Sequence, residues 1–254
     1  MPQDPLNDLF NRALGESYED ELAWEAIHTL RTMGTRDVFI HAAEWCVAPS
    51  PLQRARGVDI LAQLGRTAGN SQTLFPEETF VIVSDLLKRE HELLPLSSAI
   101  VALGHLRDSR AIPLILPFAS HLDATLRYNA AFSLGSFADD PESTGALIGL
   151  TEDTDAEVRN WATFGLGVIG NTDSPEIRDA LVHRLADDFA DAREEAMVGL
   201  AKRKDVRVLP TVLKCLESES CSMAIEAARF WLDLEDKPEP FSANELLSLL
   251  RNRQ

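Results

Sequence analysis

The chain has 254 residues, of which 45% are hydrophobic and 26% charged, and this is enough apolar material to bury a core. Its 41 acidic residues outnumber its 24 basic ones, which gives a formal net charge of −17 at pH 7. Lys and Arg are scattered among Asp and Glu and form no basic run, so the charge disfavours nucleic acid as a partner and favours a basic protein.

The sequence also carries signals about the cellular compartment. Its three cysteines, Cys46, Cys215 and Cys221, are odd in number and have no CxxC spacing, which argues against a disulfide framework and fits a reducing environment. The opening residues MPQDPLNDLF lack the pattern of a signal peptide. The longest apolar stretch, 111–119, is too short and too broken by proline to span a bilayer. We therefore expect a cytoplasmic protein that does not engage a membrane.

One unit recurs along nearly the whole chain. The segments DATLRYNAAFSLGSF from Asp123, DAEVRNWATFGLGVI from Asp155 and FADAREEAMVGLAKR from Phe189 align with one another. The late leucine of the unit extends this register in both directions, at intervals of 31 to 39 residues, through Leu30, Leu64, Leu103, Leu134, Leu166, Leu200 and Trp231. Seven copies at so regular an interval are typical of a repeat protein.

Each copy contains two helical patterns. The first includes the late leucine and has apolar residues at helical spacing, as at Val158, Ala162 and Leu166. The second is shorter, and its four clearest examples are 112–122, 141–150, 174–185 and 208–216. Turn and cap residues separate the two, and Ser174 is placed to cap a helix that begins at Pro175. No sustained alternation typical of strands appears, so we predict an all-α solenoid of about seven stacked helix pairs.

We predict a single domain over residues 1–254. Residues 20–234 hold the repeats. The segments 1–19 and 235–254 form an N-terminal and a C-terminal cap, because a stack of repeats must cover its core at both ends.

The unit D-A-x-V-R-x-x-A-x-x-x-L-G, followed by a short helix near P-x-L-x-x-L, resembles the HEAT repeat, in particular the bacterial HEAT-like repeat of phycobilin lyases. The resemblance covers most of residues 20–234. The segment from Val158 through REEAMVGLAKRKDVRVLP is similar to HEAT-repeat immunity proteins found beside polymorphic-toxin (Rhs-type) loci. The resemblance implies an all-α superhelix that binds another protein, and an immunity-type role in which it neutralises a basic toxin domain.

Three arginines, Arg127, Arg159 and Arg193, occupy one column near the start of the first helix, and Asp123 and Asp155 precede the first two by four residues. We interpret this column as a structural ladder, in which each guanidinium bridges a turn by donating to carboxylates and to carbonyls of the last helical turn. The alternative is an anion-binding or catalytic role for the arginines.

The stretch GLGVIG at 165–170 has the GxGxxG spacing of a dinucleotide-binding loop, but it closes a helix and follows no strand. Its counterparts in the neighbouring copies are mostly small, so we interpret its glycines as positions where the two helices of a pair approach closely. The histidines, serines and cysteines form no HExxH pair, nucleophile elbow or metal-type spacing. We therefore predict no catalytic residue, no metal and no cofactor.

Trp161 departs from its column, whose other members Asn129 and Glu195 are polar and predict a position that faces water. It either packs against the turn of an adjacent copy or anchors a partner, because tryptophan is enriched at binding hot spots. The resemblance also implies that the second helices line the binding face. The candidate partner-binding residues are therefore Trp161, Arg178, Asp179, His183, His121 and Lys214.

Two rival functions follow from the same repeats. A phycobilin-lyase-like enzyme or chaperone is disfavoured because no lone reactive cysteine or histidine–acid cluster is apparent. A HEAT-like DNA-repair protein should carry a basic groove, which the net charge of −17 disfavours. We therefore expect a non-enzymatic module that binds a basic protein.

Overall fold

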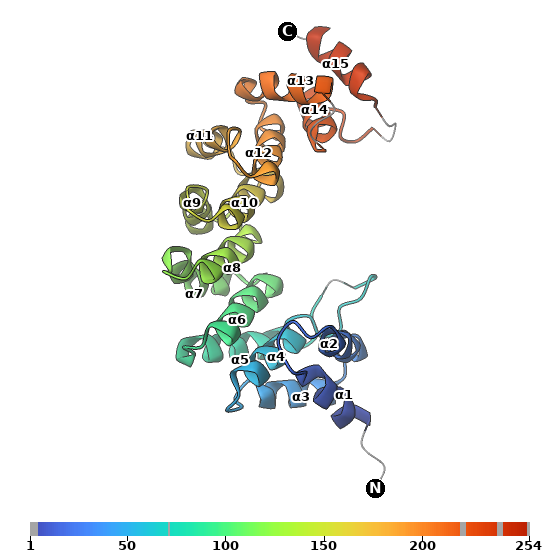
Figure 1. Cartoon of the computed structure of the whole chain (residues 1–254), viewed down its shortest axis with the longest axis vertical. Coiled ribbons are helices and arrows are strands. Elements are labelled where there is room, and N and C mark those ends of the chain that lie inside the picture. Colours follow the sequence, from blue (N-terminus) through green and yellow to red (C-terminus); the bar gives the residue numbers. More distant parts are fainter. Residues whose placement is uncertain (1–4, 71, 219–221, 238–240, 253–254) are drawn as a thin grey trace. The chain divides into compact units, whose positions relative to one another are not determined.

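The computed structural model describes residues 5–70, 72–218, 222–237 and 241–252. Within these ranges the regular structure is helical, apart from one isolated bridge between Thr67 and Asn70. The chain forms two compact units, of which the first ends at Ser133 and the second begins at Leu134. Each unit is a stack of helices (Figure 1). The predicted all-α solenoid is confirmed.

The first unit holds the N-terminal helices and ends within α8. Its elements are α1 Pro5–Leu14, α2 Glu21–Met33, α3 Arg36–Trp45, α4 Pro51–Ala62, α5 Pro76–Arg89, α6 Leu93–Leu106, the 3₁₀ turn η1 Ser109–Ala111, α7 Ile112–Ile115, the 3₁₀ turn η2 Leu116–Ser120 and α8 Ala124–Gly135. The second unit continues with α9 Pro141–Leu150, α10 Ala156–Phe164, the π-helical turn η3 Gly165–Ile169, α11 Pro175–Arg184, α12 Ala190–Lys202, the 3₁₀ turn η4 Val206–Val208, α13 Leu209–Ser218, α14 Ala224–Leu232 and α15 Ala243–Asn252.

Short polar side chains begin many of these helices. Asp155 accepts hydrogen bonds from the backbone N–H groups of Glu157 and Val158 at the start of α10. The predicted cap Ser174 accepts from the N–H of Ile177, and Pro175 takes the first helical position. These bonds satisfy donors that have no partner inside the helix. These capping residues therefore fix where α10 and α11 begin, as the sequence predicts.

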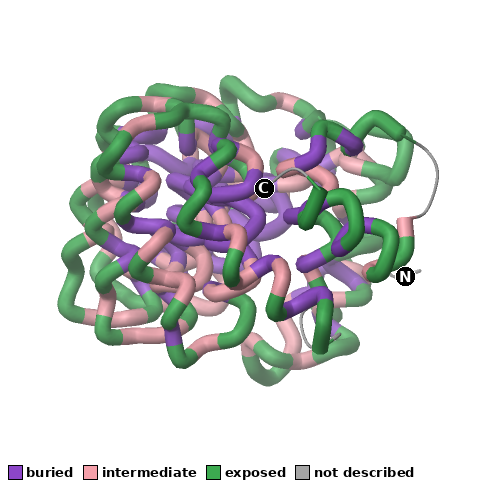
Figure 2. Tube along the Cα trace, turned by 90° about the horizontal axis from the view of Figure 1, so that it is seen from above, coloured by how far each residue is buried: buried purple, intermediate pink, exposed green. Residues whose placement is uncertain are grey.

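The late leucines form the core of the stack. Leu30, Leu64, Leu103, Leu134, Leu166 and Leu200 are each at most 1% exposed. At the seventh position the buried residue is Leu232, whereas Trp231 is half-buried. Buried and exposed residues alternate along the helices (Figure 2). In the first unit α2 packs on α4 and α4 on α6, and in the second α10 packs on α12 and α12 on α14. The first helices of the copies thus pack on one another in each unit.

Glycines let these first helices approach backbone to backbone. A Cβ atom on Gly199 would lie 2.5 Å from the Cα of Gly167, and one on Gly167 would lie 2.8 Å from the carbonyl oxygen of Glu195. Both distances are shorter than any side chain tolerates. This close approach joins α12 to the η3 turn after α10, which belong to neighbouring copies. The expectation that these glycines bring together the two helices of one pair is therefore wrong.

The arginine column makes one repeated contact. The Nη1 atoms of Arg127, Arg159 and Arg193 each donate to two backbone carbonyls, five and six residues earlier in the chain. These carbonyls belong to the turn that precedes the helix, so each guanidinium closes its own turn. Asp123 and Asp155 accept from backbone N–H groups of the same turns.

Arg54 on α4 makes the same contact, with the carbonyls of Ala48 and Pro49, although no sequence column included it. Its Nε and Nη2 atoms also donate to both carboxylate oxygens of Glu90, at 2.6 and 3.0 Å. Aligning Arg54 with Arg127 places Leu61 at the late-leucine position of this copy, where the sequence spacing had suggested Leu64. Both leucines are fully buried.

Arg159 also reaches the following copy. Its Nε and Nη2 atoms donate to the two oxygens of Asp187, at 2.8 and 2.9 Å, and Nη2 donates to Asp188 at 2.6 Å. The side chain of Asp187 is 1% exposed, and the Arg159 guanidinium holds the pKa of that carboxyl well below its usual range. The arginine therefore ties the turn before α10 to the turn before α12.

Both chain ends carry a helix outside the repeats. The N-terminal segment 1–19 contains α1, which packs on α2, and the C-terminal segment 235–254 contains α15, which packs on α13 and α14. Residues 1–4, 238–240 and 253–254 of these segments lie outside the described ranges. Among the described helices, none is long and apolar enough to cross a bilayer.

The expectation about the cysteines needs a correction. Cys215 is disulfide-bonded, so the argument against disulfides is wrong at this residue. Cys46 is a buried free thiol whose Sγ donates to the carbonyl of Ala42. Cys221 lies outside the described residues.

We expect Arg159→Ala to lower the free energy of unfolding by about 2–4 kcal/mol, because it leaves the buried Asp187 carboxylate and the turn carbonyls without their charged donor. Lys88→Ala removes an exposed ion pair with Asp85 and should cost about 0–1 kcal/mol. Urea unfolding followed by circular dichroism measures both. An unchanged midpoint for Arg159→Ala would contradict the ladder interpretation.

Candidate functional site

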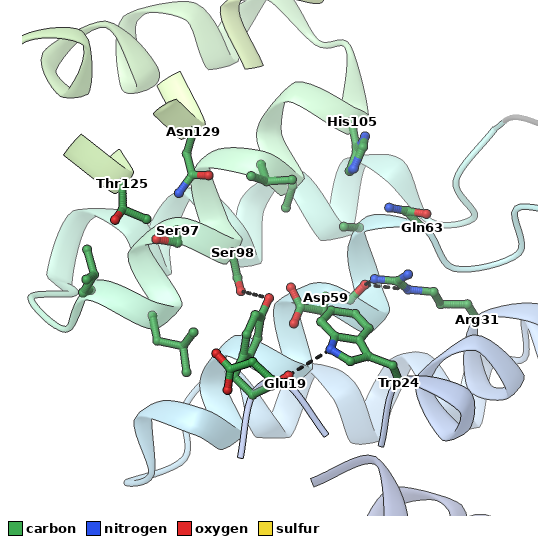
Figure 3. Close-up of a pocket in the computed structure, with 16 residues that line it drawn as sticks. Glu19, Trp24, Arg31, Asp59, Gln63, Ser97, Ser98, His105, Thr125 and Asn129 are labelled. Atoms are coloured by element: carbon green, nitrogen blue, oxygen red, sulfur yellow. Dashed lines mark hydrogen bonds between the residues drawn. The ribbon is translucent and has the colours of Figure 1, made fainter. Parts of the chain in front are cut away.

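A cavity of about 530 Å³ opens in the first unit, between first helices of successive copies. Its walls come from the segment before α2 and from α2, α4, α6 and α8 (Figure 3). The volume lies within the range of small-molecule and side-chain pockets, roughly 300–1,000 Å³. Its polar lining includes Tyr18, Arg31, Asp59, Ser97, Ser98 and Asn129.

The segment before α2 forms an aromatic wall. Trp24 donates from Nε1 to the carbonyl of Tyr18 at 2.9 Å, and the two rings meet edge to face with centroids 5.4 Å apart. The Tyr18 hydroxyl lies 3.4 Å from the hydroxyl of Ser98 on α6. Burial and the nearby Asp59 raise the pKa of Tyr18, so its hydroxyl stays neutral. Asp20 starts α2 by accepting from Leu22 and Ala23, which fixes this wall on the helix.

Arg56 holds the aromatic wall onto α4. Its side chain is fully buried, and its guanidinium carbon lies 4.7 Å from the ring centre of Tyr18 and 4.5 Å from that of Trp24. Nη2 donates to the carbonyls of Ser17 and Tyr18. Burial lowers the pKa of Arg56, and the charge of Asp59 opposes that shift. A buried cation between two rings is stabilised by the negative faces of both.

Asp59 lies one helical turn after Arg56 and is 8% exposed. Burial raises the pKa of its carboxyl, against the lowering by the Ser98 and Tyr18 hydroxyls and by the charges of Arg31 and Arg56. Arg31 directs both Nε and Nη2 to the backbone carbonyl of Asp59, at 2.9 and 2.7 Å, and not to its carboxylate (Figure 3). The carboxylate thus makes no ion pair within the described part of the chain.

His105 on α6 and Gln63 after α4 line the cavity on the same side as Arg31 (Figure 3). Burial first, and then the charges of Arg66, Arg31 and Arg107, lower the pKa of His105 to about 4. The ring stacks edge to face on Phe132, with centroids 5.7 Å apart. His105 is therefore neutral at pH 7 and contributes no charge to the site. No group of three His, Cys, Asp or Glu side chains suited to a metal ion occurs among the residues that the structure describes.

One sequence column has members in this cavity and, separately, in the second unit. Five residues before the late leucine stand Arg56, Ser98, Asn129, Trp161 and Glu195, when Leu61 is taken for α4. All are buried except Trp161, which is half-buried. The prediction that this column faces water is wrong, because each first helix packs this side against its neighbours. Ser98 and Asn129 line the cavity in the first unit.

In the second unit the same column carries Trp161 and Glu195. Trp161 meets Phe164 edge to face, with centroids 5.6 Å apart. The Glu195 side chain is 8% exposed, and its Oε2 atom finds no hydrogen-bond partner among the described residues. Burial and the nearby Asp191 raise the pKa of Glu195 to about 8. Whether Trp161 anchors a partner stays a prediction.

Two other predicted binding residues, Arg178 and Asp179, lie on α11 in a network of ion pairs. Arg178 donates to both carboxylate oxygens of Asp173, at 2.7 and 2.6 Å, and to the carbonyl of Arg203. Asp179 accepts from Arg207 at 2.6 Å. Both charges are therefore already compensated within the second unit.

His183, His121 and Lys214 lie apart from this network. His183 is exposed and lies 3.5 Å from Glu152. His121 is exposed and accepts at Nδ1 from the N–H of Asp123 in the turn before α8. Lys214 is exposed and shares a second hollow, of about 500 Å³, with the ladder residue Arg193. The structure does not bring the predicted residues together in one site.

The sequence contained a signal for the cavity that the predictions did not use. Ser98 and Asn129 belong to the column five residues before the late leucine, and Asp59 is a carboxylate inside an apolar stretch of α4. Buried charges of this kind are rare unless they are paired or functional. The second helices were expected to line the binding face, whereas this cavity is built by the first helices.

Comparison with known proteins agrees with this architecture. HEAT repeats match residues 85–167 and 149–232, which together span more than half of the chain. Protein YibA of Escherichia coli, from strains K12 and O157:H7, is 40% identical over 84 residues. That segment is 33% of this chain and spans only 29% of the length of YibA.

Solved structures extend the likeness beyond that segment. The X-ray structure of E. coli YibA matches with a TM-score of 0.73 at 24% identity, covering 97% of this chain and 91% of that chain. The CpcE–CpcF complex of phycocyanin lyase from Nostoc sp. matches with a TM-score of 0.48 at 19% identity, covering 90% of this chain and 82% of that chain. The first match shows a shared fold, and the second is too distant to bear on function.

We expect the stability of the chain to depend on pH through Glu195. Its folded pKa of about 8 lies above its ordinary value of 4.5, so its contribution is fully present below pH 4.5 and is lost as the pH rises through about 8. In thermal melts from pH 5 to 9, the melting temperature of Glu195→Gln should increase relative to that of the wild type as the pH rises. Glu226→Gln, on the exposed side of α14, serves as the control. A constant difference between Glu195→Gln and wild type across this range would contradict the assignment.

Proposed function

The chain belongs to the HEAT-repeat family, and we propose that it is a non-catalytic binding module whose partner protein docks over the cavity of the first unit. The observation that carries this proposal is the cavity itself, which combines an aromatic wall with a buried carboxylate that forms no ion pair with any described residue. A closed core would have filled such a space with apolar side chains. HEAT-type stacks offer extended faces of this kind to other proteins.

The charge beside the cavity supports a basic partner. Glu16, Glu19, Glu21 and Glu25 are all exposed, and none makes an ion pair with another described residue. Glu19 lines the cavity, and the other three lie within six residues of it in the sequence. An uncompensated acidic border speeds the encounter with a positively charged surface and rejects acidic competitors.

The finer proposal is an immunity-type role, in which the chain neutralises a basic toxin domain by covering its surface. The similarity of the segment from Val158 to immunity proteins beside Rhs-type loci supports it, as does the net charge of −17. Such a role needs binding without chemistry, in the cytoplasm where the toxin would act.

The acidic border is tested with the partner protein that the immobilised chain captures from its native host. Changing Glu16, Glu19, Glu21 and Glu25 together to Gln should slow association about 3–10-fold at low salt, and less at high salt, because steering is screened. The control changes the exposed Glu142, Glu157, Glu176 and Glu226 of the second unit to Gln. Equal association rates for the two sets of variants would contradict the proposal that these four glutamates speed the encounter with the partner.

The immunity role predicts that a gene for a basic toxin domain lies beside the gene of this chain, and it is tested by co-expressing the chain with that toxin domain. We expect a complex that survives co-purification and restores growth of the host cells. Growth arrest despite full expression of the chain, with no complex on the column, would reject this role while leaving a different protein partner open to the capture experiment.

A further inference from the structure

Three polar atoms at the cavity have no hydrogen-bond partner among the described residues. They are Oδ2 of Asp59 on α4, Oγ of Ser97 on α6 and Nδ2 of Asn129 on α8. Each is buried, and a buried polar group without a partner costs free energy in the folded state. Figure 3 shows these residues, which lie on the first helices of three copies, around the same space. The cost is offset when a bound molecule supplies the missing partners.

The two neighbouring arginines donate no hydrogen bond to the Asp59 carboxylate. Arg31 donates from two nitrogens to the backbone carbonyl of Asp59, and Arg56 donates to the carbonyls of Ser17 and Tyr18. Both arginines nevertheless place positive charge close to Asp59, and Glu19 adds a negative charge at the border. A further cation would enter beside two cations already present.

The missing partners are of two kinds. Oδ2 of Asp59 needs a donor, whereas Nδ2 of Asn129 needs an acceptor, and the Ser97 hydroxyl serves either purpose. A lysine or arginine side chain offers donors only and would leave the Asn129 amide without a partner. A peptide backbone offers N–H and C=O groups in alternation along its length and carries no charge.

The spacing between the helices also suits an extended peptide segment. Gly104 of α6 faces Ser133 of α8 closely enough that a Cβ on the glycine would lie 2.8 Å from the serine Cα, and α4 packs on α6. Two interhelical steps of about 8–10 Å each correspond to roughly five or six residues of extended chain at about 3.3–3.6 Å per residue. The N–H and C=O groups that are recognised then belong to different residues of one segment.

We propose that the cavity binds an extended segment of the partner protein by its backbone, with an N–H group donating to Asp59 and a carbonyl accepting from Asn129. The apolar lining of Leu93, Leu94 and Val101 then receives side chains of the segment. This inference rests on the proposed function, since it names the part of the partner that the cavity recognises.

The test selects binders from a phage-displayed library of random dodecapeptides on the purified full chain and measures their affinity by calorimetry. Asn129→Leu should weaken binding about tenfold, the loss expected for one hydrogen bond in a dry site. Asp59→Asn keeps a carbonyl oxygen as acceptor and should stay within about threefold of wild type. Glu195→Gln is the matched control, because it alters the same column in the other unit. Melting curves establish that each variant is folded.

A second pair of measurements examines the backbone directly. N-methylation of one peptide amide at a time should abolish binding at the position that donates to Asp59. Ser97→Tyr narrows the cavity with a residue that the fold accepts, because Tyr128 occupies the corresponding place on α8, and it should prevent selection of any of these peptides.

The proposal is overturned if Asp59→Asn abolishes binding while Asn129→Leu leaves it unchanged, since that pattern belongs to a cationic side chain. It is also overturned if wild type and Ser97→Tyr enrich the same peptides, or if neither enriches any. A captured protein partner that binds Ser97→Tyr and wild type equally, but associates more slowly when the acidic border is changed to Gln, would overturn this inference while leaving the proposed binding function intact.

Discussion

Everything in this fold depends on how closely the first helices of neighbouring copies approach. At Gly167 and Gly199 the two backbones come so near that a Cβ atom added to Gly199 would lie 2.5 Å from the Cα of Gly167. The late leucines fill the space beside these contacts and are almost wholly buried. Because the approach is so close, one whole side of each first helix is withdrawn from water, and any polar residue on that side must find a partner inside the stack.

The arginines supply hydrogen-bond partners for some of the backbone carbonyls in the turns between helices. Arg54, Arg127, Arg159 and Arg193 each donate to two carbonyls of the preceding turn, which a short helix connection would otherwise leave unsatisfied. A planar guanidinium suits the task, because its donors point in fixed directions towards several acceptors at once. Arg54 and Arg159 use the remaining donors on a carboxylate elsewhere in their unit. The column therefore serves the architecture.

The cavity lies where some buried polar groups of the first unit lack hydrogen-bond partners among the described residues. Arg56 is satisfied partly by ring faces and carbonyls, whereas Asp59 and Asn129 each keep one side-chain atom that has no hydrogen-bond partner among the described residues. Its walls α2 and α4 precede residue 85, at which the match to HEAT repeats begins, and α6 and α8 fall inside that match. The site thus combines two helices inside the matched range with two helices and an aromatic segment that precede it.

The sequence by itself determined the all-α repeat architecture, the caps at Asp155 and Ser174, and the positions of the buried leucines, because helix period, cap chemistry and repeat interval are local properties. It did not show which side of a first helix is buried, so Asn129 and Glu195 were predicted to face water. It also missed Arg54, whose copy has an altered interval between its arginine and the next repeat. Only the tertiary structure decided that Tyr18, Asp59 and Asn129 meet around one space, since they lie far apart in the chain and are joined by packing between helices.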